Sequence, residues 1–94
     1  MTEVKAISNF YQTIAEDNRI ALSHIALYMA LFQLYNVNGF VNPIKFVRGQ
    51  VMDMAKISGL ATYHKCIREL AAYGYIEYYP SFNPAVRTRV IMKV

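Results

Sequence analysis

The sequence predicts a mainly α-helical fold that ends in a small β-hairpin, and three observations support this prediction. Up to about residue 73, apolar side chains recur at spacings of three and four residues, which is typical of helices packed on a core. Residues 75–79 alternate and are rich in strand-forming types, and residues 87–94 return with a similar alternation. The tight turn Ser58-Gly59 separates the last two helices. The chain therefore ends in the order helix, turn, helix, strand, turn, strand.

Length and composition indicate one folded domain. The chain has 94 residues, 55% of them hydrophobic, and we expect a core over residues 19–94 preceded by a helical extension over residues 1–18. The single cysteine, Cys66, excludes an internal disulfide framework and fits a reducing compartment. The first residues lack the basic-then-apolar order of a signal peptide, and the most apolar run, residues 20–34, is short for a membrane span. We expect a cytoplasmic protein that does not enter the membrane.

The first predicted helix, over residues 2–17, is amphipathic. Its apolar stripe consists of Val4, Ile7, Phe10, Tyr11 and Ile14. Two uses of this helix stay open: it packs on the core of its own chain, or it forms the contact of a homodimer.

The second helix, from about Ile20 or Ser23 to Asn36, is apolar nearly all round and should be the buried central helix. One inward face is predicted to comprise Leu22, Ile25, Ala26, Met29 and Phe32. His24 stands near its start. A lone histidine in such a helix is typical of a hydrogen-bonded structural residue, and no nearby partner marks it as a ligand or a base.

A short strand, residues 44–46, and a third helix, residues 48–57, come next. This helix begins weakly because Val47 stands where Ser, Thr or Asp is favoured. The fourth helix covers residues 60–73, and Gly74 follows it at the position where glycine commonly ends a helix. Its predicted inward face comprises Tyr63, Cys66, Ile67, Leu70 and Ala71.

Two details of this region can be predicted from spacing. Lys65 and Glu69 stand four residues apart on the fourth helix and are placed to form an ion pair. In the strand that follows, alternation places Ile76 and Tyr78 toward the core and Tyr75 toward solvent.

This order of elements is that of a winged helix-turn-helix with an extra N-terminal helix. In such a fold residues 60–73 would form the recognition helix and residues 80–89 the wing. Charge follows the same division. Residues 1–44 hold two basic and three acidic residues, a net of −1, whereas residues 45–94 hold eight basic and three acidic residues, a net of +5. A basic excess confined to one part of a domain favours a polyanionic partner, and double-stranded DNA is the partner we expect.

The candidate DNA contacts come from three places. The start of a recognition helix reaches base edges, and basic residues around it grip phosphates. The predicted contact residues are Arg48, Lys56, Ala61, Thr62, His64, Lys65, Arg68, Arg87 and Arg89. Each has a plainer reading: Lys65 and Arg68 as a solvated helix face, and Arg87 and Arg89 as edge-strand charges that oppose aggregation.

Other classes of site are not indicated. His64 and Cys66 stand two apart but have no third metal ligand nearby, and Cys66 falls on the inward face. The sequence contains no glycine-rich phosphate loop and no evident catalytic set. We therefore expect no enzyme activity, no cofactor, no metal and no small-molecule ligand.

The segments Tyr63-His64-Lys65-Cys66-Ile67-Arg68-Glu69-Leu70 and Gly74-Tyr75-Ile76-Glu77-Tyr78-Tyr79-Pro80-Ser81-Phe82-Asn83-Pro84 resemble a small winged-helix family of Bacteroides-type bacteria. Its members are transcriptional regulators or DNA-binding proteins of phages and mobile elements. The chain is also similar to the N-terminal domain of DnaD-type replication initiators, and the resemblance covers about residues 10–90. It implies DNA binding in transcription or mobile-element control. The alternative is a winged-helix scaffold for protein interaction or replication initiation that reads no sequence itself.

Overall fold

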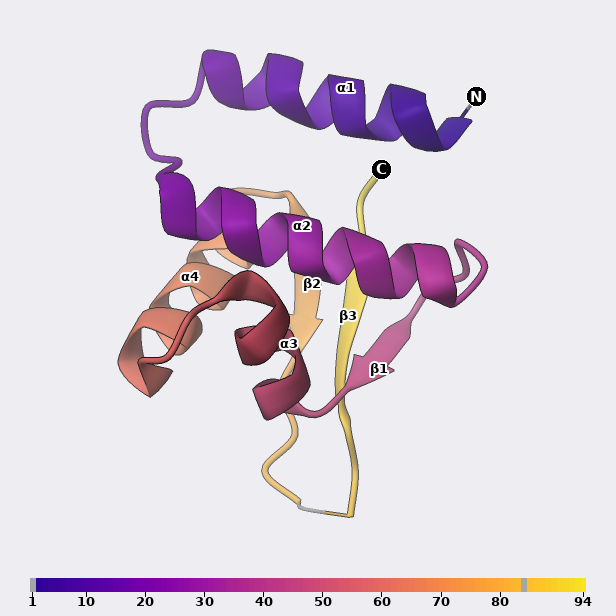
Figure 1. The fold of residues 1–94 in the computed structure, drawn as a ribbon, viewed down its shortest axis with the longest axis vertical. Helices are drawn as coiled ribbons and strands as arrows, with labels where there is room; N and C mark the ends of the chain where they lie inside the picture. The colour runs from indigo at the N-terminus through magenta and orange to yellow at the C-terminus, as the bar shows by residue number, and fades with distance from the viewer. Residues whose placement is uncertain (1, 84) are drawn as a thin grey trace.

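The computed structural model describes residues 2–83 and 85–94. Along these residues the elements are α1 (Thr2–Ala15), α2 (Leu22–Val37), β1 (Ile44–Phe46), α3 (Arg48–Ala55), α4 (Leu60–Ala72), β2 (Ile76–Tyr79) and β3 (Thr88–Met92). This confirms a mainly α fold with a small β-hairpin, and the predicted bounds differ from the observed ones by no more than two residues. Figure 1 shows α1 lying along α2, while the chain between β2 and β3 projects at the opposite end of the molecule.

The sheet is antiparallel, with the strand order β1-β3-β2. The predicted strand β1 pairs with β3, where Ile44 lies opposite Val90, and β2 pairs with β3, where Ile76 lies opposite Met92. These four side chains are buried, because one face of the sheet packs toward the helices. The opposite face is free for polar and charged residues.

Helix α2 forms the centre of the core, as its apolar sequence predicts. Leu27 and Leu31 are fully buried, and α2 packs against α3, α4 and β3. Leu22, however, was expected on the inward face, and it is 86% exposed. The buried arc instead begins at His24, and residues two apart lie nearly on opposite sides of an α-helix. The prediction for Leu22 was therefore wrong.

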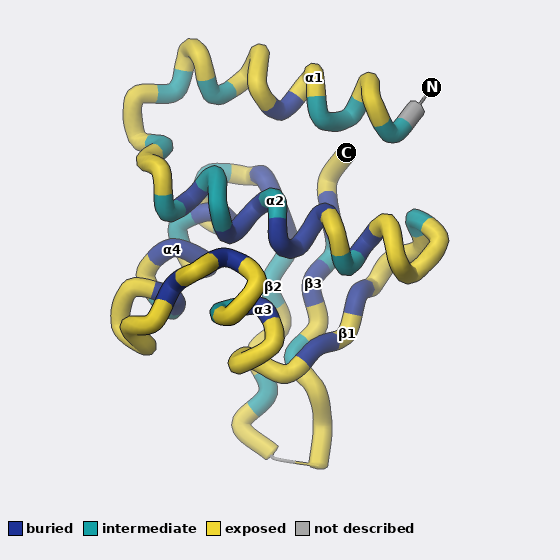
Figure 2. Tube along the Cα trace, viewed as in Figure 1, coloured by how far each residue is buried: buried dark blue, intermediate teal, exposed yellow. Residues whose placement is uncertain are grey.

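Helix α1 packs on its own chain through buried Phe10, with Ala6, Ile7 and Ile14 partly buried beside it. The ring of Phe10 stacks on that of Tyr28 with 3.8 Å between centroids and meets the ring of Tyr75 edge-on at 5.6 Å. Phe10 is buried, but Val4 and Tyr11 of the predicted stripe are exposed, and most of α1 is coloured as exposed or intermediate in Figure 2. A homodimer contact on this outer surface stays a prediction.

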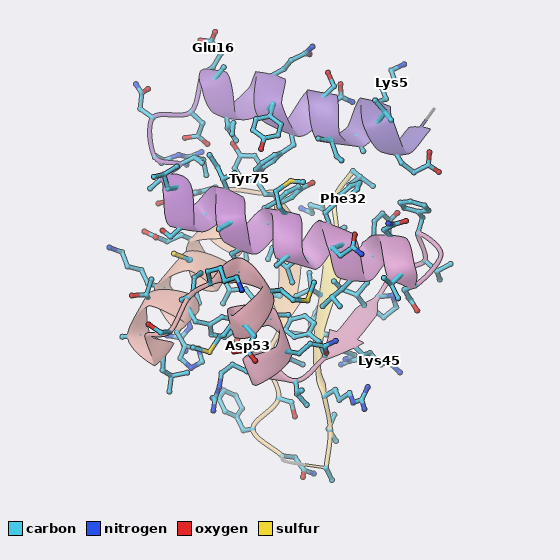
Figure 3. The ribbon with its side chains drawn as sticks, in the orientation of Figure 1. Lys5, Glu16, Phe32, Lys45, Asp53 and Tyr75 are labelled. Carbon is cyan, nitrogen blue, oxygen red and sulfur yellow. The ribbon has the colours of Figure 1, made fainter. Side chains whose placement is uncertain are left out.

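Tyr75 corrects another expectation, because it is buried instead of facing solvent. Figure 3 shows its side chain between α1 and α2. Its hydroxyl donates a hydrogen bond of 2.8 Å to the carboxylate of Asp17, which also accepts hydrogen bonds of 2.8 and 2.9 Å from the guanidinium of Arg19. The alternation of the strand could not reveal that α1 and the α1–α2 connection cover this side of Tyr75.

Two backbone turns place α4 and the hairpin. Lys56 ends α3 in the left-handed region at φ 60°, and Gly59 caps the start of α4 with an extended backbone. Gly74, at φ 90°, ends α4 as predicted: its N–H donates to the carbonyl of Ala71 and the N–H of Tyr75 donates to that of Leu70. This pair of hydrogen bonds is a Schellman motif, which turns the chain from α4 directly into β2.

Replacing Phe10 by Ala is expected to lower the free energy of unfolding by about 3 kcal/mol, because a buried ring and its stacking contact are lost. Urea denaturation measures this change. The control is Val4→Ala, on the exposed side of the same helix, for which we expect a change within about 0.5 kcal/mol. Equal stability of both variants would show that α1 does not contribute to this core.

Candidate nucleic-acid interface

The packing of α4 decides which of its side chains are free to meet a partner. Its predicted inward face is confirmed at four positions: Tyr63, Cys66, Ile67 and Leu70 are buried. The opposite face therefore points outward. It carries the predicted contact residues Ala61, Thr62, Lys65 and Arg68, all of them exposed. Ala61, Lys65 and Arg68 follow one another at helical spacing along this outer face.

A groove lies beside this face, between the start of α3, α4 and the chain that links β2 to β3. It has a volume of about 450 Å³. Four predicted contact residues line it, namely Arg48, His64, Arg68 and Arg87, and none of the described residues that line it is acidic. Three segments that are separate in the sequence thus bring positive charge to one hollow.

The charges of this groove are not neutralised by ion pairs. Among residues 2–83 and 85–94, neither Arg48 nor Arg68 forms a salt bridge; Arg19 pairs with Asp17, and His24 contacts Glu69. Burial lowers the pKa of His64 below its usual range, and the positive charges of Arg68 and Arg48 lower it further. The two arginines are thus close enough to His64 to act on its ring.

Two tyrosines complete the wall of the groove. Burial raises the pKa of the Tyr63 hydroxyl; Tyr78 raises this pKa further, and the positive charge of Arg48 lowers it. Burial also raises the pKa of Tyr78. Tyr63 Oη and His64 Nδ1 are buried, and neither has a hydrogen-bond partner among the described residues. Sequence reasoning assigned Tyr63 to the core and missed that this residue also lines a groove, since a spacing pattern shows which face a side chain lies on but not what lies at its far end.

The predicted wing is a basic loop with one prominent apolar side chain. Ser81 and Asn83 exchange hydrogen bonds that shape the loop, and Phe82 beside them is 90% exposed. Arg87, at the end of the loop, is also exposed. Residue 84 of the predicted wing lies outside the described residues.

Two of the predicted residues lie apart from the groove. Arg89 lies on the outward side of β3, opposite Lys45 of β1, with its guanidinium 5.8 Å from the ring centroid of Tyr79. Lys56 ends α3 and lines a different hollow that includes Asp53. Arg89 meets Arg87 in a neighbouring hollow beside the chain between β2 and β3, but neither Arg89 nor Lys56 lines the groove with Arg48 and Arg68.

The expected ion pair between Lys65 and Glu69 is absent from the described residues, because Glu69 has other partners. His24 Nδ1 accepts the N–H of Ala21 at 2.9 Å, so Nε2 carries the proton and donates to Glu69 at 3.0 Å. The hydroxyl of Tyr73 donates to the same carboxylate at 3.2 Å. His24 is thus the hydrogen-bonded structural residue that was predicted. Lys65 forms no salt bridge among the described residues, although its charge helps to lower the pKa of Glu69.

Comparison of the chain with protein-family models, with curated proteins and with solved structures finds no match. Within the described part of the chain, no group of three or more His, Cys, Asp or Glu side chains is placed to hold a metal ion. The helices described there are all too short or too polar to span a bilayer.

The lowered pKa of His64 predicts how stability depends on pH. Its folded-state pKa lies below that of the unfolded chain, about 6.5, so the unfolded state binds more protons as the pH falls below that value. Stability contributed by neutral His64 is therefore present above pH about 6.5 and is lost as the pH falls below it. Arg68 from α4 and Arg48 from α3 act on its pKa, and the other titratable residues that line the same groove are Tyr63 from α4, Tyr78 from β2 and Arg87 between β2 and β3.

Urea denaturation between pH 8 and 5 tests this prediction by comparing the native chain with His64→Gln. The native chain should lose more stability on acidification than the variant, because the variant cannot take up a proton at this position. Since His24 is present in both proteins, the difference isolates His64. Parallel pH profiles would contradict the prediction.

Proposed function

We propose that this chain is a winged helix-turn-helix protein that binds double-stranded DNA, with α4 as its recognition helix and the chain between β2 and β3 as its wing. The observation that carries the proposal is the groove in which Arg48, Arg68 and Arg87 converge without an acidic neighbour. An ordinary solubilising surface mixes both signs of charge. A hollow lined by one sign, beside an exposed helix, suits a polyanion.

The exposed face of α4 fits this use. The major groove of B-DNA is about 12 Å wide and admits one α-helix. Thr62, near the start of α4, would reach base edges, and Lys65 and Arg68 would read guanine or grip phosphate. Arg87 at the wing would contact the backbone or the minor groove beside it, where the exposed ring of Phe82 would also lie. Arg89 and Lys56 would contribute at most outer phosphate contacts.

For the process served, we propose transcriptional or mobile-element regulation without catalytic activity, as the resemblance of residues 63–84 implies. A homodimer through the outer surface of α1 would double the DNA contacts. The alternative, a protein-interaction scaffold, would be favoured by a large apolar patch on α4. Among the described large apolar side chains of α4, Leu60 alone is exposed, and one side chain does not form such a patch. Val47, Phe82 and Val86 are also exposed, but they line the groove among its arginines. The convergence of these arginines without an acidic neighbour favours the DNA-binding function over the scaffold.

The double variant Lys65→Ala/Arg68→Ala tests the proposed face. Each phosphate contact contributes a slope of about 0.9 to the fall of log affinity with log salt. The variant should therefore bind a labelled random duplex roughly tenfold more weakly and with a slope smaller by about 2. Fluorescence anisotropy from low to physiological salt measures both quantities.

The matched control is Lys5→Ala/Lys93→Ala, which removes the same net charge at exposed positions outside the groove. It should change affinity far less. Equal losses in the two double variants would mean that net charge, and not the face of α4, governs binding. Absence of duplex binding by the native chain at low salt would reject the proposal.

A further inference from the structure

Two buried polar atoms of the groove have no partner within the described chain. They are Tyr63 Oη and His64 Nδ1. Tyr63 as a whole is only 1% exposed. Folded proteins pair nearly all of their buried polar groups. Both residues line the groove, although the two atoms themselves are buried beneath its surface. Two unpaired atoms on neighbouring residues at this place therefore indicate that something else supplies their partner.

The position of the Tyr63 hydroxyl points to the same groove. Its pKa is influenced by Tyr78 and Arg48, and both of these residues line the groove together with Tyr63 itself. The hydroxyl end of the side chain thus lies near Arg48 and Tyr78, beneath the surface of the groove wall. An O–H group near the Arg48 guanidinium, with no acceptor among the described residues, is a donor that an anion would satisfy.

The start of α3 adds a further preference for negative charge. Val47 precedes this helix and has no side chain that could cap its first N–H groups. Val47 and Arg48 both line the groove, so the positive end of the α3 dipole lies at its edge. Helix N-termini favour phosphate groups for this reason.

We propose that this groove binds one phosphate group of a DNA strand, with Arg48 and Arg68 as its charged ligands and the Tyr63 hydroxyl as a neutral donor. The inference rests on the proposed function: a strand that contacts both the outer face of α4 and the wing has to cross the groove between them. His64 would add a hydrogen bond from Nδ1. The contact explains why the fold keeps a tyrosine hydroxyl buried and unpaired. A free phosphate or nucleotide has the same chemistry, and the experiment below separates the two sources.

The variant Tyr63→Phe removes a single oxygen atom from this site. We expect five- to tenfold weaker binding of a labelled random duplex in fluorescence anisotropy, with thermal stability unchanged or higher. Stability should not fall, because the hydroxyl that is removed has no partner within the described chain. A merely structural hydroxyl would give the reverse result, namely lower stability and unchanged affinity.

Tyr35→Phe is the matched control. It removes the hydroxyl of another buried tyrosine, on α2, that does not line the groove. It should leave duplex affinity unchanged. If Tyr63→Phe binds the duplex as tightly as the native chain does, the phosphate site is wrong although the proposed DNA-binding function stands.

Titration with inorganic phosphate and with adenosine monophosphate distinguishes a DNA strand from a free ligand as the source of the phosphate group. Chloride at equal ionic strength is the reference. The two readouts are displacement of the labelled duplex and the NMR signals of the His64 ring. Displacement of the duplex by phosphate no better than by chloride supports the DNA strand as the source. Displacement well beyond chloride overturns that source in favour of a free ligand. If the native chain binds no duplex, the proposed function fails. A change in the His64 signals on addition of phosphate, abolished by Tyr63→Phe, would then still support the phosphate site. If phosphate does not change the His64 signals, the phosphate site is overturned as well.

Discussion

Burial of one face of α4 is the constraint on which the rest of the structure depends. Ile67 and Leu70 are fully buried between the central helix α2 and the strand β2. Because that face is committed to the core, the opposite side of the same helix must present Lys65 and Arg68 to solvent. Gly74 then turns the chain sharply into β2, so the hairpin begins beside α4 and its loop forms the second wall of the basic groove.

Hydrogen bonds away from the groove hold two acidic side chains that could otherwise neutralise its arginines. Glu69 is held by His24 from α2 and by Tyr73, and burial of the His24 ring makes this contact part of the core. Asp17 is held by Arg19 and by Tyr75 in the same way. Two of the acidic side chains nearest to the core are thus engaged away from the groove. The groove is positively charged both because the arginines line it and because Glu69 and Asp17 form hydrogen bonds elsewhere.

Periodicity alone predicted most of the fold. The inward face of α4, the short strand at residues 44–46 and the stop at Gly74 each depend on local spacing or on one backbone requirement, and these are visible in a sequence. The burial of Tyr75 and the partner of Glu69 were not predictable in this way. Both depend on contacts with residues far away in the chain, Asp17 for Tyr75 and His24 for Glu69.

The candidate site likewise has features that local spacing predicts and features that depend on distant contacts. Spacing predicted that Lys65 and Arg68 share the outer face of α4, and charge distribution predicted a basic surface in this part of the chain. Which basic residues converge could not be predicted: Arg48 and Arg87 reach the groove, whereas Lys56 and Arg89 do not. The unpaired hydroxyl of Tyr63 is a property of the packed structure. Only the completed fold shows that this oxygen has no acceptor among the described residues and that Tyr63 lines the groove with Arg48 and Arg68.

The most direct test of the central claim is an NMR titration of the ¹⁵N-labelled protein with a random duplex at low salt, in which perturbed amide signals map the contact surface. The account predicts that shifts concentrate at the start of α3, on the outer face of α4 and in the loop between β2 and β3, while the signals of α1 stay unchanged. Shifts centred on α1 or on the ends of α2, or a complete absence of shifts, would contradict it.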